Sequence, residues 1–366
     1  MKNKVICGTI YVTLRKIPQK LFSLLKETDK MGNLSLETME NIMNITVYVF
    51  VFLFGITIGS FLNVCILRLP RGESLVKRNS HCMTCGTPIK WYDLIPVFSW
   101  LILRGKCRAC GSKISPRYML VESLTGVMFV GIFLRYNFFD YGLYPVMLCL
   151  FMAGLIVLCF QDIDNREMCV SVLIYTFIIA IASHVLNFIT VDTQKLLFFP
   201  ETDLRDGIYG MLSVSLVILV MGFVVTPLFY NAFVSEERKS LRGVKANLKR
   251  TSESDRNYKK LVAEKEALEA KIKEEGPVFG FGMGDVILMA AGGLMLGLKA
   301  TITAGIIAVV LGAIYGVILK YIRRNDDSED SNVFAFGPFL IIGLAVGAFV
   351  NGSLIDMYLN SLHIGR

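Results

Sequence analysis

Eight apolar segments follow one another along the chain, and most of them reach the roughly 18 residues that a helix needs to cross a bilayer. The sixth is short and rich in glycine, so it fits a membrane span least well. They do not alternate apolar and polar residues as the strands of an outer-membrane barrel do. We therefore predict an all-α polytopic membrane protein with about eight transmembrane helices. The segments cover roughly residues 45–67, 119–136, 143–161, 170–190, 207–233, 285–298, 301–322 and 334–358.

The composition agrees with this interpretation, since 54% of the 366 residues are hydrophobic. Basic residues gather in two of the polar segments: 68–118 carries ten Lys and Arg against Glu73 and Asp93, and 234–281 carries twelve. The loops on the opposite side carry one or two each. By the positive-inside rule, the two basic segments lie in the cytoplasm. The net charge of +8 then follows the topology and does not indicate a nucleic-acid partner.

The beginning of the chain fits this topology poorly. Eight helices place both termini outside, whereas the first thirty residues are basic. Two explanations are open: an amphipathic stretch on the membrane surface, or a natural start at Met31 or Met39. We favour the second, because residues 31–44 contain no Lys or Arg. The stretch also lacks a clear apolar core and the small-residue site of a cleavable signal peptide.

The polar segments divide the chain into regions. The insert at 234–278 ends in a predicted helix that Gly276 and Pro277 terminate. Its apolar face is too short for a coiled coil, so a solvated cytoplasmic helix is the simplest interpretation. That face consists of Tyr258, Leu261, Leu268 and Ile272. The regions are an N-terminal extension (1–44), a first transmembrane helix (45–67), a cytoplasmic four-cysteine domain (68–118), helices two to five (119–233), the charged insert (234–278) and helices six to eight (279–366).

Two pairs of cysteines lie in the first basic segment. "CMTC" contributes Cys82 and Cys85, "CRAC" contributes Cys107 and Cys110, and a glycine follows each pair. Two such pairs place four thiolates within reach of one Zn²⁺, as in a zinc ribbon. Chance is a poor explanation for two phased pairs, and disulfides are disfavoured on a reducing, cytoplasmic face. We predict a structural zinc site, because four thiolates leave no open position for catalysis. His81 is adjacent but surplus.

Acidic residues stand at the ends of two apolar segments. Asp285 lies at the start of the sixth, within "GFGMGDVILMAAGGLMLG", and Asp162 and Asp164 follow the third, within "LCFQDIDNREM". An ionisable group in an apolar segment costs free energy unless a partner or a function offsets it. Helix counting places both segment ends on the cytoplasmic side. An aspartate at a span end is commonly a boundary residue or helix cap, but here the two positions can converge.

Two converging carboxylates have a specific chemistry. They cannot both ionise cheaply, so one holds a proton while the other is charged. Such a pair can take a proton from water and give one to a scissile carbonyl, as in aspartic proteases. Gly282 and Gly284 would let a substrate backbone approach Asp285 closely.

With these motifs in place, the chain resembles the prepilin peptidases, the type IV leader peptidase family of bacterial membrane aspartic proteases. The resemblance implies that Asp162 and Asp285 are the catalytic pair, that Gly282 and Gly284 form the motif around the latter, and that Asp164 is auxiliary. It is carried by "GSFLNVCILRLPRGES" (59–74), the long cysteine block (80–126), "DIDNRE" (162–167), "GMGDV" (282–286) and "FGPFLIIG" (336–343).

The resemblance also implies a second activity, methylation of the new N-terminal amine with S-adenosylmethionine as donor. The sequence has no strand, Gly-rich turn and helix of the nucleotide-binding kind, so the donor site is unassigned. The implied substrates are prepilins or pseudopilins with a basic, Gly-terminated leader and an apolar helix in the bilayer. The implied location is the bacterial inner membrane, with the aspartates and the zinc site on the cytoplasmic side.

The chain departs from the family pattern at two places. Cys169 and Val170 stand where Pro and then Asp or Asn are usual, and Ile287 stands where Lys is common. Two alternatives to the bifunctional enzyme are open. One is a peptidase without methyltransferase activity, and the other is a zinc-stabilised transporter that uses Asp162 and Asp285 for ion or proton movement.

Overall fold

A computed structural model describes residues 36–76, 80–136, 141–193, 203–225, 235–248, 256–274, 282–322, 335–350 and 353–361. The first thirty residues and the possible start at Met31 lie outside these ranges, whereas the possible start at Met39 lies within the first described one. The chain divides into two compact units, 1–51 and 52–366. Within the first, the described residues form the beginning of one long helix. Everything below concerns the second unit.

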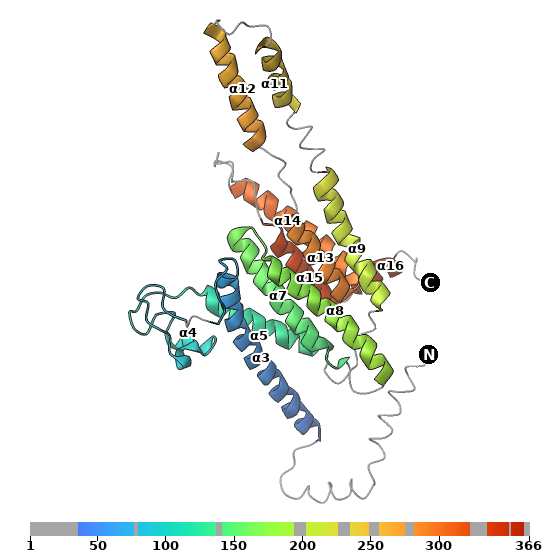
Figure 1. Ribbon diagram of the computed structural model, residues 1–366. Coiled ribbons are helices and arrows are strands. Elements are labelled where there is room, and N and C mark those ends of the chain that lie inside the picture. Colours follow the sequence, from blue (N-terminus) through green and yellow to red (C-terminus); the bar gives the residue numbers. More distant parts are fainter. Residues whose placement is uncertain are drawn as a thin grey trace, which may run out of the picture. The chain divides into compact units, whose positions relative to one another are not determined.

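The described part of the chain is helical and contains no β-strand, only isolated bridges. Figure 1 shows the helices and labels most of them. In chain order they are α3 (Leu36–Arg68), η2 (Trp91–Leu94), α4 (Phe98–Ile102), α5 (Arg117–Arg135), α7 (Tyr144–Asn165), α8 (Val170–Thr193), α9 (Leu204–Val220), the π turn η3 (Met221–Val225), α11 (Ser235–Leu248), α12 (Arg256–Glu274), α13 (Met283–Leu296), α14 (Leu298–Ile322), α15 (Gly337–Val350) and α16 (Ser353–Ser361).

Eight apolar helices in the described residues coincide with the eight predicted segments. Five are long and apolar enough to cross a membrane, and three are shorter. The predicted all-α polytopic fold is therefore confirmed. The long helices are Asn41–Arg68, Arg117–Arg135, Tyr144–Asn165, Leu204–Phe223 and Leu298–Leu319. The shorter ones are Val170–Leu186, Met283–Leu296 and Gly337–Val350.

The last predicted segment, 334–358, was drawn too long. The structure divides it into α15 and a separate α16. Asp356 of α16 accepts a 2.5 Å hydrogen bond from the ammonium group of Lys299, at the start of α14. An exposed ion pair of this kind suits a polar surface, so α16 is not a continuation of the apolar span.

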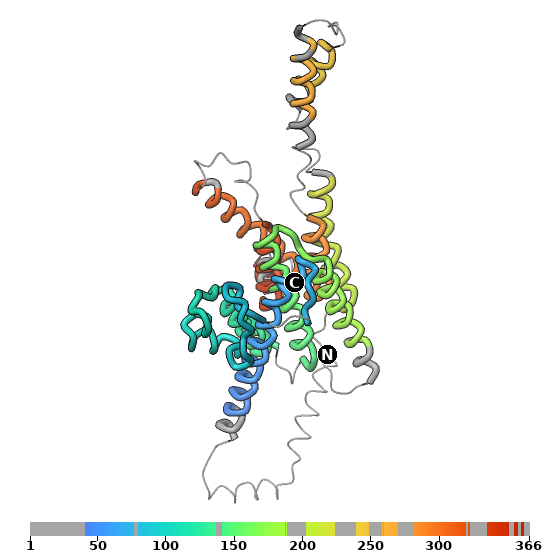
Figure 2. The backbone as a smooth tube through the Cα atoms, turned by 60° about the vertical axis from the view of Figure 1, so that its left-hand side comes forward, coloured from blue at the N-terminus to red at the C-terminus, as the bar shows by residue number. Residues whose placement is uncertain are grey.

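Small residues let the helices approach closely, as is common in membrane bundles. α9 and α13 lie side by side although they are far apart in the sequence (Figure 2). They cross where Gly210 meets Gly293, and a Cβ added at Gly210 would lie 2.5 Å from the Gly293 carbonyl oxygen. α3 and α5 cross in the same way, since a Cβ at Gly55 would lie 2.8 Å from the Cα of Gly126. The first of these contacts holds α13, which carries Asp285, against α9.

α7 and α13 are both packed against α8 and α15. The arrangement brings the C-terminal end of α7, the loop into α8, and the N-terminal ends of α13 and α15 into one neighbourhood, as the glycine contacts below show. The insert contains a helix at its end, as expected from the sequence, and one more before it among the described residues. The two helices, α11 and α12, contact each other and share a 2.8 Å ion pair between Lys245 and Glu269.

Candidate active site and metal site

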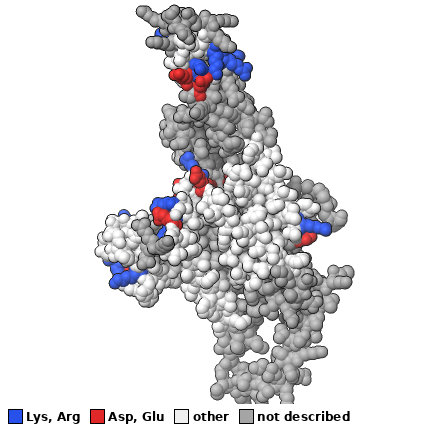
Figure 3. Space-filling model, in the orientation of Figure 1, with Lys and Arg blue, Asp and Glu red and all other residues white. Residues whose placement is uncertain are grey.

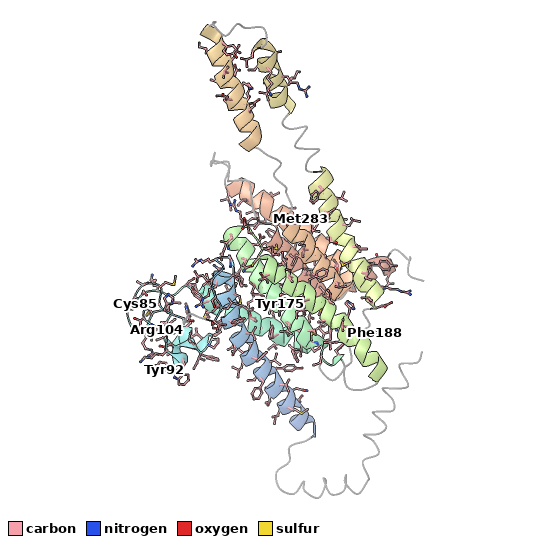
Figure 4. The ribbon with its side chains drawn as sticks, viewed as in Figure 1. Cys85, Tyr92, Arg104, Tyr175, Phe188 and Met283 are labelled. Carbon is pink, nitrogen blue, oxygen red and sulfur yellow. The ribbon has the colours of Figure 1, made fainter. Side chains whose placement is uncertain are left out.

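Asp285 is the third residue of α13 and is buried. Its Oδ2 accepts a 3.1 Å hydrogen bond from the backbone N–H of Gly282, and its own N–H donates to the Gly282 carbonyl at 3.1 Å. The carboxylate thus closes the first turn of the helix, where the helix dipole favours negative charge. This capping role orients the side chain, and it explains how the helix tolerates a carboxylate at its entry. Figure 4 labels Met283, the first residue of the same turn.

Asp162 lies in the last turn of α7 and is also buried. The helix ends just after it, because Arg166 adopts the left-handed conformation (φ 56°) and its N–H donates to the Asp162 carbonyl at 2.9 Å. The backbone amide of Gly337 faces the Asp162 carboxylate. Among the described residues, Oδ2 of Asp162 has no hydrogen-bond partner. A buried carboxylate oxygen without a partner is costly, and such groups concentrate at functional sites.

The two aspartates share one site. Both carboxylates are buried, and one residue lies in the surroundings of both. Met168, in the loop between α7 and α8, joins their surroundings. A Cβ added at Gly284 would lie 3.4 Å from Met168 Sδ, and one added at Gly337 would meet both Met168 and Asp162. Helices far apart in the sequence therefore bring the two buried carboxylates into one neighbourhood, whose catalytic role stays a prediction.

Asp164 has a different environment. It is exposed, and its Oδ2 accepts a 2.6 Å hydrogen bond from the guanidinium of Arg117, at the start of α5. That guanidinium also lies 5.1 Å from the ring centroid of Phe160. Asp164 thus ties the end of α7 to the start of α5. Its observed contacts are structural, so an auxiliary role in catalysis stays a prediction.

Three residues near the aspartates had no role in the sequence interpretation: Gln161, Met168 and Gly337. Gln161 is fully buried, its Oε1 accepts a 3.3 Å hydrogen bond from the Cys169 N–H, and its Nε2 has no partner among the described residues. Gly337 falls within "FGPFLIIG", which carried the resemblance without an assigned role. A local pattern could not find Met168, because its contacts depend on how α13 and α15 pack.

The four cysteines also converge, in what we call the cysteine lobe, residues 80–116. Their four Sγ atoms lie within 4.8 Å of one another, and Sγ of Cys82 is 3.9 Å from Sγ of Cys110. Zinc–sulfur bonds of about 2.3 Å in a tetrahedron require sulfur separations of about 3.8 Å. The donor set and its spacing therefore fit a metal ion. His81 is not part of this group.

The lobe repeats one local structure around each cysteine pair. The Cys82 N–H donates to the Thr87 carbonyl at 3.0 Å, and the Cys107 N–H donates to the Ser112 carbonyl at 2.8 Å. The glycine after each pair has a positive φ, 68° at one and 71° at the other, so a side chain there would be strained. An isolated antiparallel bridge completes each turn. Figure 4 labels Cys85, Tyr92 and Arg104 in this lobe.

Backbone and hydroxyl donors stabilise thiolates in the lobe. The Cys85 amide, the Ser112 hydroxyl and the Thr84 amide lower the pKa of Cys82 to about 5. The Ser112 side chain also lowers the pKa of Cys110. Because the thiolate is the form that binds metal, these hydrogen bonds prepare the site for an ion.

Comparison with known proteins relates this geometry to a family. A family model described as the Bacterial Peptidase A24 N-terminal domain matches residues 53–136. The Type 4 prepilin-like proteins leader peptide-processing enzyme of Escherichia coli is 31% identical over 310 residues, which cover 79% of this chain and 88% of that enzyme. The chain belongs to the prepilin leader peptidase family.

Two other members of the prepilin leader peptidase family show how the similarity is distributed. The Prepilin leader peptidase/N-methyltransferase of Xanthomonas campestris is 27% identical over 328 residues, covering 83% of this chain and 92% of the relative. That of Myxococcus xanthus is 44% identical over 117 residues, only 32% of this chain and 34% of the relative. No solved structure gives a significant match. The resemblance noted in the sequence is confirmed.

The structure gives one departure from the family pattern a physical context. A prolyl residue at position 169 would have no N–H, whereas the N–H of Cys169 donates to Gln161. The buried amide of Gln161 therefore has a partner that the usual prolyl residue of prepilin leader peptidases could not supply. Ile287 lies on the first turns of α13, and nothing in the structure explains its replacement of the usual Lys.

Proposed function

We propose that this protein cleaves the leader peptide of type IV prepilins or pilin-like proteins and methylates the new N-terminus. The names of the E. coli, Xanthomonas and Myxococcus relatives support the proteolysis, and the latter two also name the methyltransferase. The observation that carries the proposal is that Asp162 and Asp285 are both buried and that Met168 lies close both to Gly284, beside Asp285, and to Gly337, which faces Asp162. Both lie in terminal turns of their helices, which suits a site at a membrane boundary better than the mid-membrane site of a transporter.

In the proposed mechanism, one aspartate is charged and the other carries a proton, because two close carboxylates cannot both ionise cheaply. The charged member takes a proton from a water molecule, whose oxygen attacks the scissile carbonyl carbon. The protonated member gives its proton to the carbonyl oxygen. The intermediate then collapses with transfer of a proton to the leaving amine. Asp285 is held for this task by Gly282, and Asp162 by the start of α15.

We place the aspartates and the cysteine lobe on the cytoplasmic side of the inner membrane. The ion pair between Arg117 and Asp164 supports a common side, since it joins the helix that leaves the lobe to the turn that carries Asp162. The excess of Lys and Arg in 68–118 supports the cytoplasm. A leader that remains in the cytoplasm, joined to an apolar helix in the bilayer, would reach such a site directly.

We propose Zn²⁺ as the ion of the cysteine lobe, held by Cys82, Cys85, Cys107 and Cys110 with a structural role. For the methyl donor, S-adenosylmethionine is implied by the family. The described residues contain no strand–turn–helix unit of the nucleotide-binding kind, so they offer no recognisable cradle for it. We assign no residue to that group and derive no step through it.

Co-expression with a candidate prepilin tests the proposed function. Intact-mass analysis of the substrate should show loss of the leader and a further increment of one methyl group. Loss of the leader without the increment would identify a peptidase that lacks the second activity. A substrate that keeps its leader, although enzyme and substrate are both present in the membrane, would refute the proposal.

A further inference from the structure

The cysteine lobe exposes large apolar side chains over a short stretch that contains η2, α4 and their junction. We call this set the apolar edge; it consists of Trp91, Leu94, Ile95, Phe98, Leu101 and Ile102. Trp91 is 78% exposed and Ile102 is 75% exposed. Grouped apolar exposure of this kind on a polar segment marks a surface that contacts something other than water.

The lobe does not need these side chains for its own packing. Trp100 serves that purpose: its ring would meet a Cβ added at Gly105 at 2.7 Å, and its indole N–H donates to the Ile114 carbonyl at 3.3 Å. Trp91 instead makes an edge-to-face contact with Tyr92 and leaves most of its surface exposed. Trp100 is therefore half-buried and packs into the lobe, whereas Trp91 lies on its surface.

A hydrogen bond fixes the depth of the apolar edge relative to α5. The N–H of Val97 donates to Oε2 of Glu122 at 2.7 Å, and Val97 adopts a positive φ of 64° in doing so. Glu122 is buried and lies five residues after Arg117, so it is about 7–8 Å along the helix axis at 1.5 Å per residue. The headgroup region of a bilayer is roughly 5–8 Å thick on each side. If α5 starts at the membrane surface, Val97 lies where headgroups meet acyl chains.

The exposed face of α5 at the same depth is apolar. Leu120 and Leu124, one turn apart on the face opposite Glu122, are 52% and 40% exposed. In a membrane-spanning helix, such side chains contact lipid. The edge residues Phe98 and Leu101 follow Val97 directly in the chain and are exposed as well.

The charge of the lobe identifies the kind of surface. Residues 80–116 contain five Lys and Arg and one acidic residue, Asp93. That single carboxylate is bound by Arg108 at 2.6 Å. Lys90 and Arg108 both lie over the ring of Tyr92, at 5.7 and 5.5 Å from its centroid. Figure 3 shows Lys and Arg on the surface of the lobe. Aromatic and aliphatic side chains with adjacent basic groups are typical of segments that lie in the interface of anionic membranes.

We propose that the apolar edge is a membrane-contact surface, which inserts beside α5 at the headgroup level of a leaflet containing anionic phospholipid. The lobe is then held at both ends by membrane helices and along its side by lipid. This would fix its orientation above the bilayer independently of the catalytic role proposed for the aspartates.

Fluorescence of Trp91 tests this inference. The chain has two tryptophans, so Trp100→Phe leaves Trp91 as the only one. The full-length variant is reconstituted in vesicles of phosphatidylcholine and phosphatidylglycerol whose acyl chains carry bromine at a shallow or a deep position. We expect loss of Trp91 emission with shallow bromine, less loss with deep bromine, and little quenching by iodide in the water. Bromine on phosphatidylglycerol should quench more than the same fraction on phosphatidylcholine.

The matched control is Trp91→Phe, which keeps only the internal Trp100 and should be quenched weakly by either lipid. If Trp100→Phe impairs the lobe, shown by loss of bound zinc, the difference between wild type and Trp91→Phe reports Trp91 instead. Free quenching of Trp91 by iodide without an effect of brominated lipid would overturn the proposal. Protection from both quenchers would also overturn it, since the edge would then be covered by protein, such as a second copy of the chain. Equal quenching by the two brominated lipids would overturn the anionic preference.

Discussion

Gly337, the first residue of α15, lies directly against the carboxylate of Asp162, at the end of α7: a Cβ added at Gly337 would be 2.5 Å from Asp162 Oδ2. The contact leaves no room for a side chain. It also places the backbone amide of Gly337 opposite the carboxylate. The start of α15 therefore belongs to the candidate active site as one of its walls.

We expect Gly337→Ala to lower leader cleavage by about ten-fold or more, equivalent to about 1.4 kcal/mol in activation free energy. The added methyl group must displace Asp162, since overpacked sites relax only at a cost of about 1–3 kcal/mol. Cleavage of a co-expressed prepilin, followed by mass analysis, measures the effect. Gly243→Ala is the control, because nothing lies within 4 Å of that position. Normal cleavage by Gly337→Ala in a protein that retains its metal would contradict the assignment.

The proposed dyad makes a sharper prediction. Asp162→Asn and Asp285→Asn should each abolish cleavage, because an amide can be neither the base nor the acid of the pair. The double variant should be no worse than either single one, since both losses disable the same step. Asp164→Asn is the matched control and should retain measurable cleavage, because Asp164 is exposed and bound to Arg117. Robust proteolysis by Asp285→Asn would end the dyad hypothesis.

The methyltransferase activity can be separated from the dyad. If methylation has its own site, Asp162→Asn and Asp285→Asn should still methylate a substrate that is supplied already cleaved. The mass of the substrate before and after incubation gives the answer. Loss of both activities in folded variants would indicate a shared site.

The hydrophobic pattern predicted the helices because membrane helices must be apolar over a fixed length, a constraint that acts locally. The grouping of the four cysteines was also predictable from their spacing, and counting the helices suggested that Asp162 and Asp285 lie on the same side. The place of Gly337 and Met168 could not be predicted. Their contacts depend on how α7, α13 and α15 pack together, which no short stretch of sequence encodes.

The same limit explains two smaller differences. The ion pair of Asp164 with Arg117 joins residues 47 positions apart, so the sequence could not show that Asp164 links two helices. In the insert, the sequence interpretation used the apolar face of the later helix and did not identify the earlier one, Ser235–Leu248, which is polar overall.

Substitutions at the glycines around Asp285 can separate an effect on substrate contact from an effect on packing. A Cβ at Gly284 would lie 3.4 Å from Met168, and one at Gly282 would lie 3.8 Å from the Gly284 nitrogen, so both positions can accept a methyl group. We expect Gly284→Ala to fold normally yet to cleave several-fold more slowly, because the methyl group would obstruct the approach of a substrate backbone. Thermal unfolding and cleavage assays on the same preparation test this. Unchanged cleavage would show that the substrate does not pass this glycine.

The metal site predicts a stoichiometry. Purified protein should contain about one zinc per chain, and Cys82→Ser or Cys107→Ser should lose it, because three remaining ligands bind far more weakly than four. Elemental analysis measures the content. His81→Ala, one residue from Cys82 but outside the ligand group, should retain the metal. Full zinc content in Cys82→Ser would exclude the four-thiolate site. The lobe should lose stability before catalysis is affected directly.

The last prediction concerns the insert. In the structure α11 and α12 contact each other, with Lys245 bound to Glu269 on an exposed surface. If the pair is a self-contained appendage, replacing residues 240–270 by a short Gly/Ser linker should leave cleavage within a few-fold of wild type. The linker must only be long enough for α13 to keep its place, so that Asp285 still meets Asp162. A deletion of the same residues without a linker is the control for that requirement. Loss of cleavage in a well-folded variant that carries the linker, with zinc content unchanged, would instead assign the two helices to substrate recognition.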